Sequence, residues 1–132
     1  MSNLSSLKTV ISGSYRKHLN EMFSIKDHLT KHGIDVLAPV SECVLNPGEE
    51  FVLLDMDPVA DHRILQDSIF AKMRQSSFLV VANKEGYIGK AALIEIGYAI
   101  ALGLQILTLE PVEDLNIKPY CRLIADVFTK AV

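Results

Sequence analysis

Short apolar runs alternate with longer segments along the chain, and glycine, proline or asparagine stands at most of the joints between them. Continuous apolar runs are typical of strands buried on both faces, whereas apolar spacings of three and four residues are typical of helices with one buried face. The short runs predict strands at 7–12, 34–38, 78–82 and 105–109. The longer segments predict helices at 18–32, 61–75, 89–103 and 117–130.

This alternation predicts β-α-β units, in which parallel strands are joined by crossover helices. Because the strands are continuously apolar, we expect helices on both faces of the sheet, reached by right-handed crossovers. We therefore expect an α/β fold, a three-layer α/β/α sandwich with a small parallel sheet of the Rossmann-like or flavodoxin-like kind. A chain of 132 residues, 49% of them hydrophobic, fits a single domain over residues 1–132.

The segment 39–60 fits neither pattern. Pro47 and Pro58 interrupt any regular element, yet the segment also contains the apolar run FVLL. Long irregular segments in compact domains are usually functional or cover other parts of the molecule. Asp55 and Asp57 resemble the DxD motif of aspartyl-phosphate phosphatases, but that motif lies on the first strand, whereas here it lies in mid-chain and runs into a proline. We favour an acidic loop over a phosphatase site.

The charge balance of the chain bears on whether its partner is a nucleic acid or a small molecule. Thirteen lysine and arginine residues stand against sixteen aspartate and glutamate residues, which gives a net charge of −3 without any basic run. Binding to a nucleic-acid backbone requires a basic surface. We therefore expect a small-molecule partner and no nucleic acid.

The remaining composition indicates a cytoplasmic protein without a metal or cofactor. Cys43 and Cys121 lie far apart and outside any metal spacing, which is typical of packing residues in a reducing compartment. No apolar run reaches the ~18 residues of a membrane span, and the first residues lack the apolar core of a signal peptide. We expect the 18–32 helix to face solvent in part, together with the histidines on or near it. No metal-ligand spacing is shared by the four histidines, which are His18, His28, His32 and His62.

Ligands of parallel α/β sheets bind beyond the carboxyl ends of the strands, so the loops that follow the strands form the candidate site. The first loop, SGSYR at 12–16, places hydroxyl groups and a guanidinium at a helix entrance, where backbone N–H groups and the helix dipole hold anions. It lacks the spacing of nucleoside triphosphate and dinucleotide loops. One alternative is a tight turn with an arginine in solvent. The other is an anion or hydroxyl site formed by Ser12, Gly13, Ser14 and Arg16.

Glu95 is the only charged residue between Ala91 and Leu109. In a helix that begins near residue 89 or 90, it lies past the first turn, where a carboxylate would cap free N–H groups. Its neighbours one turn away are alanines and a tyrosine, so it has no basic partner on its own helix. One alternative is a carboxylate that reaches solvent. The other is a carboxylate in a pocket, where burial raises its pKa and makes it useful as a base or nucleophile.

Two segments, GSYR at 13–16 and NKEGYIGKAALIEIGYAIALGLQI at 83–106, resemble the nucleoside 2-deoxyribosyltransferase-like superfamily, which includes the deoxynucleoside 5'-monophosphate N-glycosidases. GYIG and EIGYA carry most of the resemblance. The resemblance implies that Glu95 is the nucleophile that attacks the anomeric carbon of the sugar, and that Tyr15 orients this carboxylate. It also implies a sugar or phosphate site in the loop before the nucleophile helix, lined by Asn83, Gly86, Tyr87 and Gly89.

The chain departs from the family pattern at two positions. Ser77 stands where the family commonly has an aspartate at the start of the third strand. Ile69 stands where another family aspartate acts near the nucleobase. Asp67 is the nearest carboxylate to that second position and completes an expected catalytic set with Glu95 and Tyr15.

These expectations converge on an enzyme that cleaves an N-glycosidic bond, or transfers a deoxyribosyl group, on a nucleoside or nucleoside 5'-monophosphate. Such reactions develop positive charge on the sugar, which a carboxylate stabilises or traps covalently. The alternative is a non-catalytic nucleotide-binding module on the same fold. We also expect a homodimer or higher homo-oligomer, because the 89–103 helix is apolar nearly all round and, with FVLL, needs more cover than one sheet face provides.

Overall fold

The computed structural model describes residues 7–39 and 61–128, which form a five-stranded parallel sheet and three α-helices. The strands are β1 (Lys8–Ser12), β2 (Asp35–Ala38), β3 (Phe78–Val81), β4 (Gln105–Thr108) and β5 (Cys121–Leu123). The helices are α1 (Tyr15–Lys31), α2 (His62–Arg74) and α3 (Lys90–Leu102). The segment 40–60, with FVLL, Asp55 and Asp57, lies outside the described residues.

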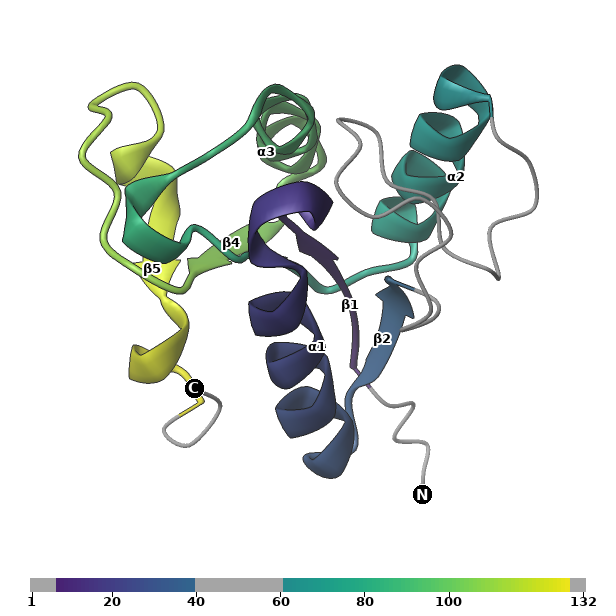
Figure 1. Cartoon of the computed structure of the whole chain (residues 1–132), viewed down its shortest axis with the longest axis horizontal. Coiled ribbons are helices and arrows are strands. Elements are labelled where there is room, and N and C mark those ends of the chain that lie inside the picture. Colours follow the sequence, from purple (N-terminus) through teal and green to yellow (C-terminus); the bar gives the residue numbers. More distant parts are fainter. Residues whose placement is uncertain (1–6, 40–60, 129–132) are drawn as a thin grey trace.

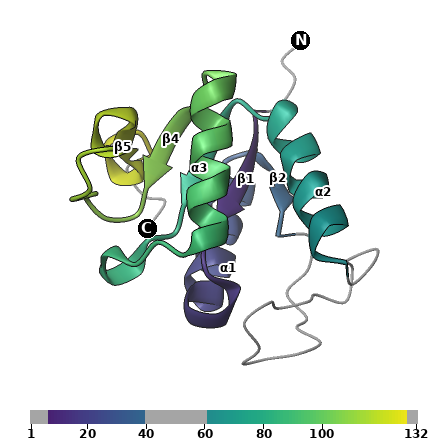
Figure 2. The same ribbon diagram turned by 90° about the horizontal axis from the view of Figure 1, so that it is seen from above.

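The helices form layers on both faces of the sheet, so the predicted three-layer α/β/α arrangement is confirmed (Figures 1 and 2). On one face, α1 packs through Met22, Ile25 and Leu29 onto a core that includes Ile11 and Val80. On the other face, α2 and α3 cover a second core. Neighbouring strand residues point to opposite faces, and the second core accordingly contains Val10, Leu79, Val81, Met73, Ile96 and Ala99.

The strand order is β2-β1-β3-β4-β5, and every neighbouring pair is parallel. The chain builds outward from β1 to β2, then returns to place β3 on the other side of β1. In flavodoxin-like sheets with this order, the crevice at the reversal between β1 and β3 is where ligands bind. The loops that leave β1 and β3 therefore diverge at the carboxyl edge of the sheet, which is the part of the fold that positions a site.

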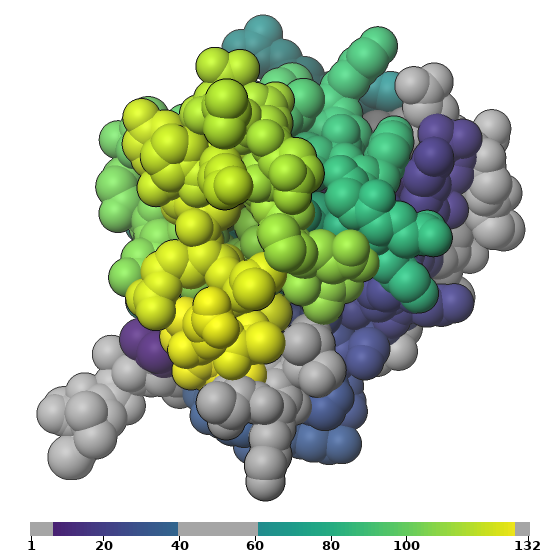
Figure 3. Space-filling view, turned by 90° about the vertical axis from the view of Figure 1, so that its left-hand side faces the viewer, coloured from purple at the N-terminus to yellow at the C-terminus, as the bar shows by residue number. Residues whose placement is uncertain are grey.

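The C-terminal part of the chain differs from the expectation. The predicted helix at 117–130 is wrong over its described residues: two 3₁₀ turns, Lys118–Tyr120 and Ile124–Asp126, flank the short strand β5. The cause is tertiary, because β4 would otherwise present unpaired backbone groups at the sheet edge, and pairing with Cys121–Leu123 satisfies them. Figure 3 views the molecule from this side, where the yellow C-terminal segment forms much of the surface.

Helix α1 begins three residues earlier than predicted. Ser14 adopts an extended backbone conformation and caps the helix by accepting a hydrogen bond from the Lys17 N–H at 3.2 Å. His18, expected on a partly solvent-facing helix, is only 5% exposed. It follows the same spacing of three and four residues as Met22, Ile25 and Leu29, so it lies on the buried face. Its backbone angles are not helical, and they kink the first turns of α1.

Within the described ranges 7–39 and 61–128, no helix has the length and apolar character that crossing a bilayer would require.

Candidate active site around Glu95

Glu95 lies in the interior, with only 8% of its surface exposed. Helix α3 starts at Lys90 after Gly89, so Glu95 is in the second helical turn, on the side that packs against the sheet. Oε1 of Glu95 accepts a hydrogen bond from Oγ of Ser12 at 2.5 Å. Oε2 accepts one from Nε2 of Gln66 at 2.9 Å. The alternative in which Glu95 reaches solvent is therefore wrong.

Burial sets the electrostatics of this carboxyl group. Removal from water disfavours the charged form and raises the pKa of Glu95, and the hydrogen bonds from Ser12 and Gln66 oppose this rise without cancelling it. Among the described residues, none adds a charge that contributes to the shift. The carboxyl group is thus buried and held by two neutral donors, and groups whose pKa is shifted by burial are frequent at functional sites.

Three separate segments bring these side chains together at the carboxyl edge of the sheet. Ser12 is the last residue of β1, which ends beside the reversal point of the strand order. Helices α2 and α3 are held side by side by Tyr98. Its ring packs on Phe70 with centroids 4.4 Å apart, and its hydroxyl accepts a hydrogen bond from Nη1 of Arg74 at 2.6 Å. This packing fixes Gln66 of α2 relative to Glu95 of α3.

The turn between β1 and α1, together with the first two residues of α1, contains four of the residues predicted for the site. A Cβ atom on Gly13 would lie 3.2 Å from Sδ of Met22 and 3.3 Å from Cβ of Ala82, so glycine allows the helix and β3 to approach closely. Ser14 uses its hydroxyl as the cap of α1. Tyr15 is partly buried against the core under α1, and Arg16 is exposed in the first turn. Of the predicted set, Arg16 is the side chain best placed to meet a ligand from solvent.

The loop between β3 and α3 is fixed chiefly through Asn83 and Glu110. Asn83 is buried. Its Nδ2 donates a hydrogen bond to the Glu110 carbonyl oxygen, and its Oδ1 accepts one from the Glu110 N–H, each at 2.9 Å. Both amide groups are thus used inside the protein, and the predicted role of Asn83 in substrate binding has no support in this geometry. Glu85 and Gly86 have positive φ values of 59° and 79°. Glycine adopts such a backbone conformation without strain, so Gly86 suits its position.

Tyr87 connects this loop to the start of α1. Its ring lies 4.1 Å from Nζ of Lys17 and makes an edge-to-face contact with the His18 ring at 5.8 Å. Nδ1 of His18 is buried without a hydrogen-bond partner among the described residues. Gly89 follows as the N-cap of α3, and no side chain caps that helix end. Tyr87 and Gly89 thus lie beside the start of α3.

Asp67 is not part of the Glu95 cluster. Its side chain is 61% exposed on α2 and pairs with Arg63 of the same helix at 3.6 Å. Ile69 packs against the core on the α2 and α3 face, and Ser77 lies at the amino end of β3, opposite the edge that holds Ser12. The residue of α2 that reaches Glu95 is Gln66, which the sequence reasoning missed. No local signal marks it, because its contact with Glu95 depends on the packing of α2 beside α3.

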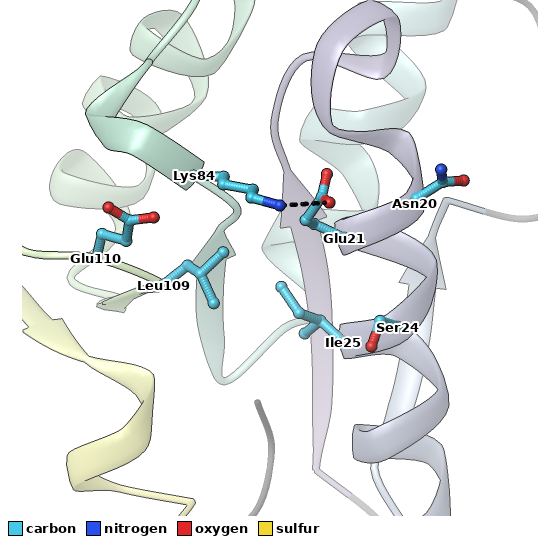
Figure 4. Close-up of a pocket in the computed structure, with 7 residues that line it drawn as sticks. All are labelled: Asn20, Glu21, Ser24, Ile25, Lys84, Leu109 and Glu110. Carbon is cyan, nitrogen blue, oxygen red and sulfur yellow. Dashed lines mark hydrogen bonds and ion pairs between the residues drawn. The ribbon is translucent and has the colours of Figure 1, made fainter.

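A separate cavity of about 430 Å³ lies on the α1 face of the sheet (Figure 4). Ile25 and Leu109 give it an apolar base, and Lys84 reaches across to pair with Glu21 at 3.2 Å. None of Ser12, Gln66 and Glu95 lines it, so it is distinct from the site built around the carboxyl group.

The described residues contain no group of three or more histidine, cysteine, aspartate or glutamate side chains that could hold a metal ion. The chain matches no model of a known protein family and no curated protein sequence.

Proposed function

We propose that the protein cleaves the N-glycosidic bond of a nucleoside or nucleoside 5'-monophosphate, or transfers its deoxyribosyl group to another base, with Glu95 as the nucleophile. The observation that carries this proposal is the burial of one carboxyl group between the Ser12 hydroxyl and the Gln66 amide at the carboxyl edge of the sheet. The resemblance of GYIG and EIGYA to the nucleoside 2-deoxyribosyltransferase-like superfamily supports the same role.

In the proposed reaction, a lone pair of the Glu95 carboxylate forms a bond to the anomeric carbon while the bond from that carbon to the base nitrogen breaks. The bonding pair leaves with the base, which takes up a proton from solvent. Water, or an N–H nitrogen of a second base, then attacks the anomeric carbon, the bond to the Glu95 oxygen breaks to release the carboxylate, and the attacking group gives up a proton to solvent. Because positive charge builds on the sugar in both steps, a fixed carboxylate beside it lowers both barriers.

A second candidate function is a nucleotide-binding module without turnover. The observation that favours it is the lack of a second acid in the described cluster: Asp67 is exposed and paired with Arg63, and Ile69 is apolar. A base that leaves without an acid beside it departs more slowly. The residues around Glu95 would then bind a nucleoside and release it unchanged.

Ligand contacts are proposed at the start of α1. Arg16 is exposed in the first turn, and the nearby N–H groups of a helix N-terminus favour negative charge. A 5'-phosphate or a sugar hydroxyl could accept hydrogen bonds from the Arg16 guanidinium and from these N–H groups. We assign the protein to the cytoplasm on its composition, with small molecules rather than nucleic acid as partners.

Self-association is proposed through α3. Leu93, Ile94 and Leu102 are 44%, 56% and 39% exposed on this helix, and Ile64 of α2 is 52% exposed. Exposed apolar side chains on neighbouring helices favour burial against a second copy. Light scattering at tens of micromolar protein should give at least the mass of a dimer, and a monomer would contradict this proposal.

The function is tested by incubating the protein with a panel of ribonucleosides, deoxyribonucleosides and their 5'-monophosphates, and separating the products by chromatography. Release of free base, lost in Glu95→Gln, supports the glycosidase. Exchange of one base for another, seen only when a second base is added, supports the transferase. Binding of a panel member without release of base supports the module.

A further inference from the structure

The two oxygen atoms of Glu95 are held from different depths of the molecule. Ser12, which binds Oε1, is 2% exposed and belongs to β1, an inner strand of the sheet. Gln66, which binds Oε2, is only partly buried and belongs to the surface helix α2. The partner of Oε1 therefore lies in the interior, whereas the partner of Oε2 lies nearer to the surface, the side from which a substrate arrives.

The partner of Oε2 is neutral and can reverse its role. An amide side chain donates through Nε2 to a carboxylate, and after a half-turn it accepts through its oxygen from a protonated carboxyl group. A lysine or arginine in its place would bind the carboxylate more strongly and oppose the loss of its charge on bond formation. An aspartate or glutamate would repel it. Glutamine holds the direction of Oε2 while leaving the charge of Glu95 free to change.

We propose that Gln66 is a positioning residue that aims Oε2 of Glu95 as the reacting oxygen, while Ser12 anchors Oε1 at the end of the sheet. This inference rests on the proposed function of Glu95. It assigns to α2 a direct part in the site, through a residue that neither the sequence pattern nor the expected acid at Asp67 indicated. Helix α2 therefore contributes orientation to the reaction and not a second carboxylate.

The inference is tested with Gln66→Met, which keeps the length of the side chain and removes the donor, and with Gln75→Met as the matched control. Gln75 ends the same helix and is exposed. The first readout is the titration of the Glu95 carboxyl group by ¹³C NMR, assigned by its absence in Glu95→Gln. The second is the pH dependence of kcat on the substrate that the parent turns over best.

Gln66→Met should raise the pKa of Glu95, because it removes one of the two hydrogen bonds that stabilise the charged form. The acid limb of the kcat profile should move to higher pH by the same amount. At its plateau, kcat should fall about 10- to 100-fold, since a misdirected nucleophile loses orientation, while KM changes about twofold or less. Gln75→Met should leave the titration and kcat at the parent's values.

An unchanged Glu95 titration in Gln66→Met would overturn the proposal, as would a kcat equal to that of the parent. If Gln66→Met loses its thermal unfolding transition, Gln66→Glu, which keeps the side-chain shape, decides the matter. Its added negative charge should raise the pKa of Glu95 beyond the parent's. A parent without turnover on any substrate would overturn Oε2 as a reacting oxygen together with the proposed function. The titration would still decide separately whether Gln66 holds the carboxyl group.

Discussion

Ser12 and Glu95, 83 residues apart in the chain, are joined by a buried hydrogen bond of 2.5 Å from the serine hydroxyl to the carboxylate. Hydrogen bonds to a charged group contribute about 1.5–3 kcal/mol, and loss of one leaves a buried acceptor unsatisfied. Ser12→Ala should lower the free energy of unfolding by about that amount at neutral pH and should raise the pKa of Glu95. Urea denaturation at neutral pH checks the first effect. Equal stability of the two proteins would contradict a bond of this kind.

Glu95→Gln should separate stability from chemistry. The Ser12 hydroxyl and the Gln66 amide can each donate or accept, so both can satisfy a neutral amide at position 95. The variant should therefore unfold at a temperature no lower than the parent's, and it should still bind nucleosides. Base release should fall on the order of 10³-fold or more, because the amide cannot act as a nucleophile. Retained base release in an active protein would remove Glu95 from the nucleophile role.

The raised pKa of Glu95 also predicts the pH dependence of stability. In the unfolded chain this carboxyl group has its ordinary pKa, whereas burial raises the pKa in the folded protein. Between these two pKa values the folded state keeps a proton that the unfolded state has lost. The stability that the protonated Glu95 contributes is therefore lost as pH rises through this window. Relative to Glu95→Gln, the parent should thus become less stable from acidic to neutral pH. Parallel urea titrations of both proteins measure this difference, and a constant difference would contradict it.

Gly13 and Gly97 should respond in opposite directions to alanine. A Cβ atom at Gly13 meets Met22 and Ala82 at 3.2 and 3.3 Å, whereas one at Gly97 meets no atom within 4 Å. Gly13→Ala should destabilise the fold by about 1 kcal/mol through overpacking. Gly97→Ala, inside α3, should stabilise it by ~0.5–1 kcal/mol, since alanine favours the helix. Thermal denaturation of both variants tests this, and equal shifts would refute the close approach of α1 and β3.

Arg16→Ala should weaken binding of nucleoside 5'-monophosphates more than binding of the matching nucleosides. A guanidinium forms charge-assisted hydrogen bonds with phosphate, and these contribute about 1.5–3 kcal/mol, or roughly 10- to 150-fold in affinity. Arg63→Ala is the control, because Arg63 is an exposed arginine on α2 whose partner is Asp67. Calorimetry with both ligand classes measures the effect. Equal losses for phosphorylated and unphosphorylated ligands would leave the 12–16 loop as a simple turn.

Much of the fold could be predicted because its signals are local. The apolar runs at 7–12, 34–38, 78–82 and 105–109 lie within one residue of β1 to β4 at each end. The error at 117–130 arose where a short strand is stabilised by the edge of β4, which no local pattern contains. Propensity and spacing are weak evidence wherever such a tertiary partner decides the structure.

The site was predictable only in part, for the same reason. Glu95 was identified because a charge within an apolar helix is anomalous by itself. The sequence does not indicate Gln66, because its contact with Glu95 depends on the packing of α2 beside α3. It favours Asp67, a carboxylate near the family position, which the structure places outside the cluster. Asn83 was assigned to a ligand although its amide is used by the backbone of Glu110, 27 residues further along the chain.

The two edges of the sheet are short, and each carries charge and adjoins a proline. β2 begins with the exposed Asp35 and is followed by Pro39, and β5 has the exposed Arg122 at its centre and follows Pro119. Such edges oppose the addition of a strand from another molecule. The addition of strands from further copies at these edges, and with it open-ended growth into fibres, is thereby disfavoured even where the protein is concentrated.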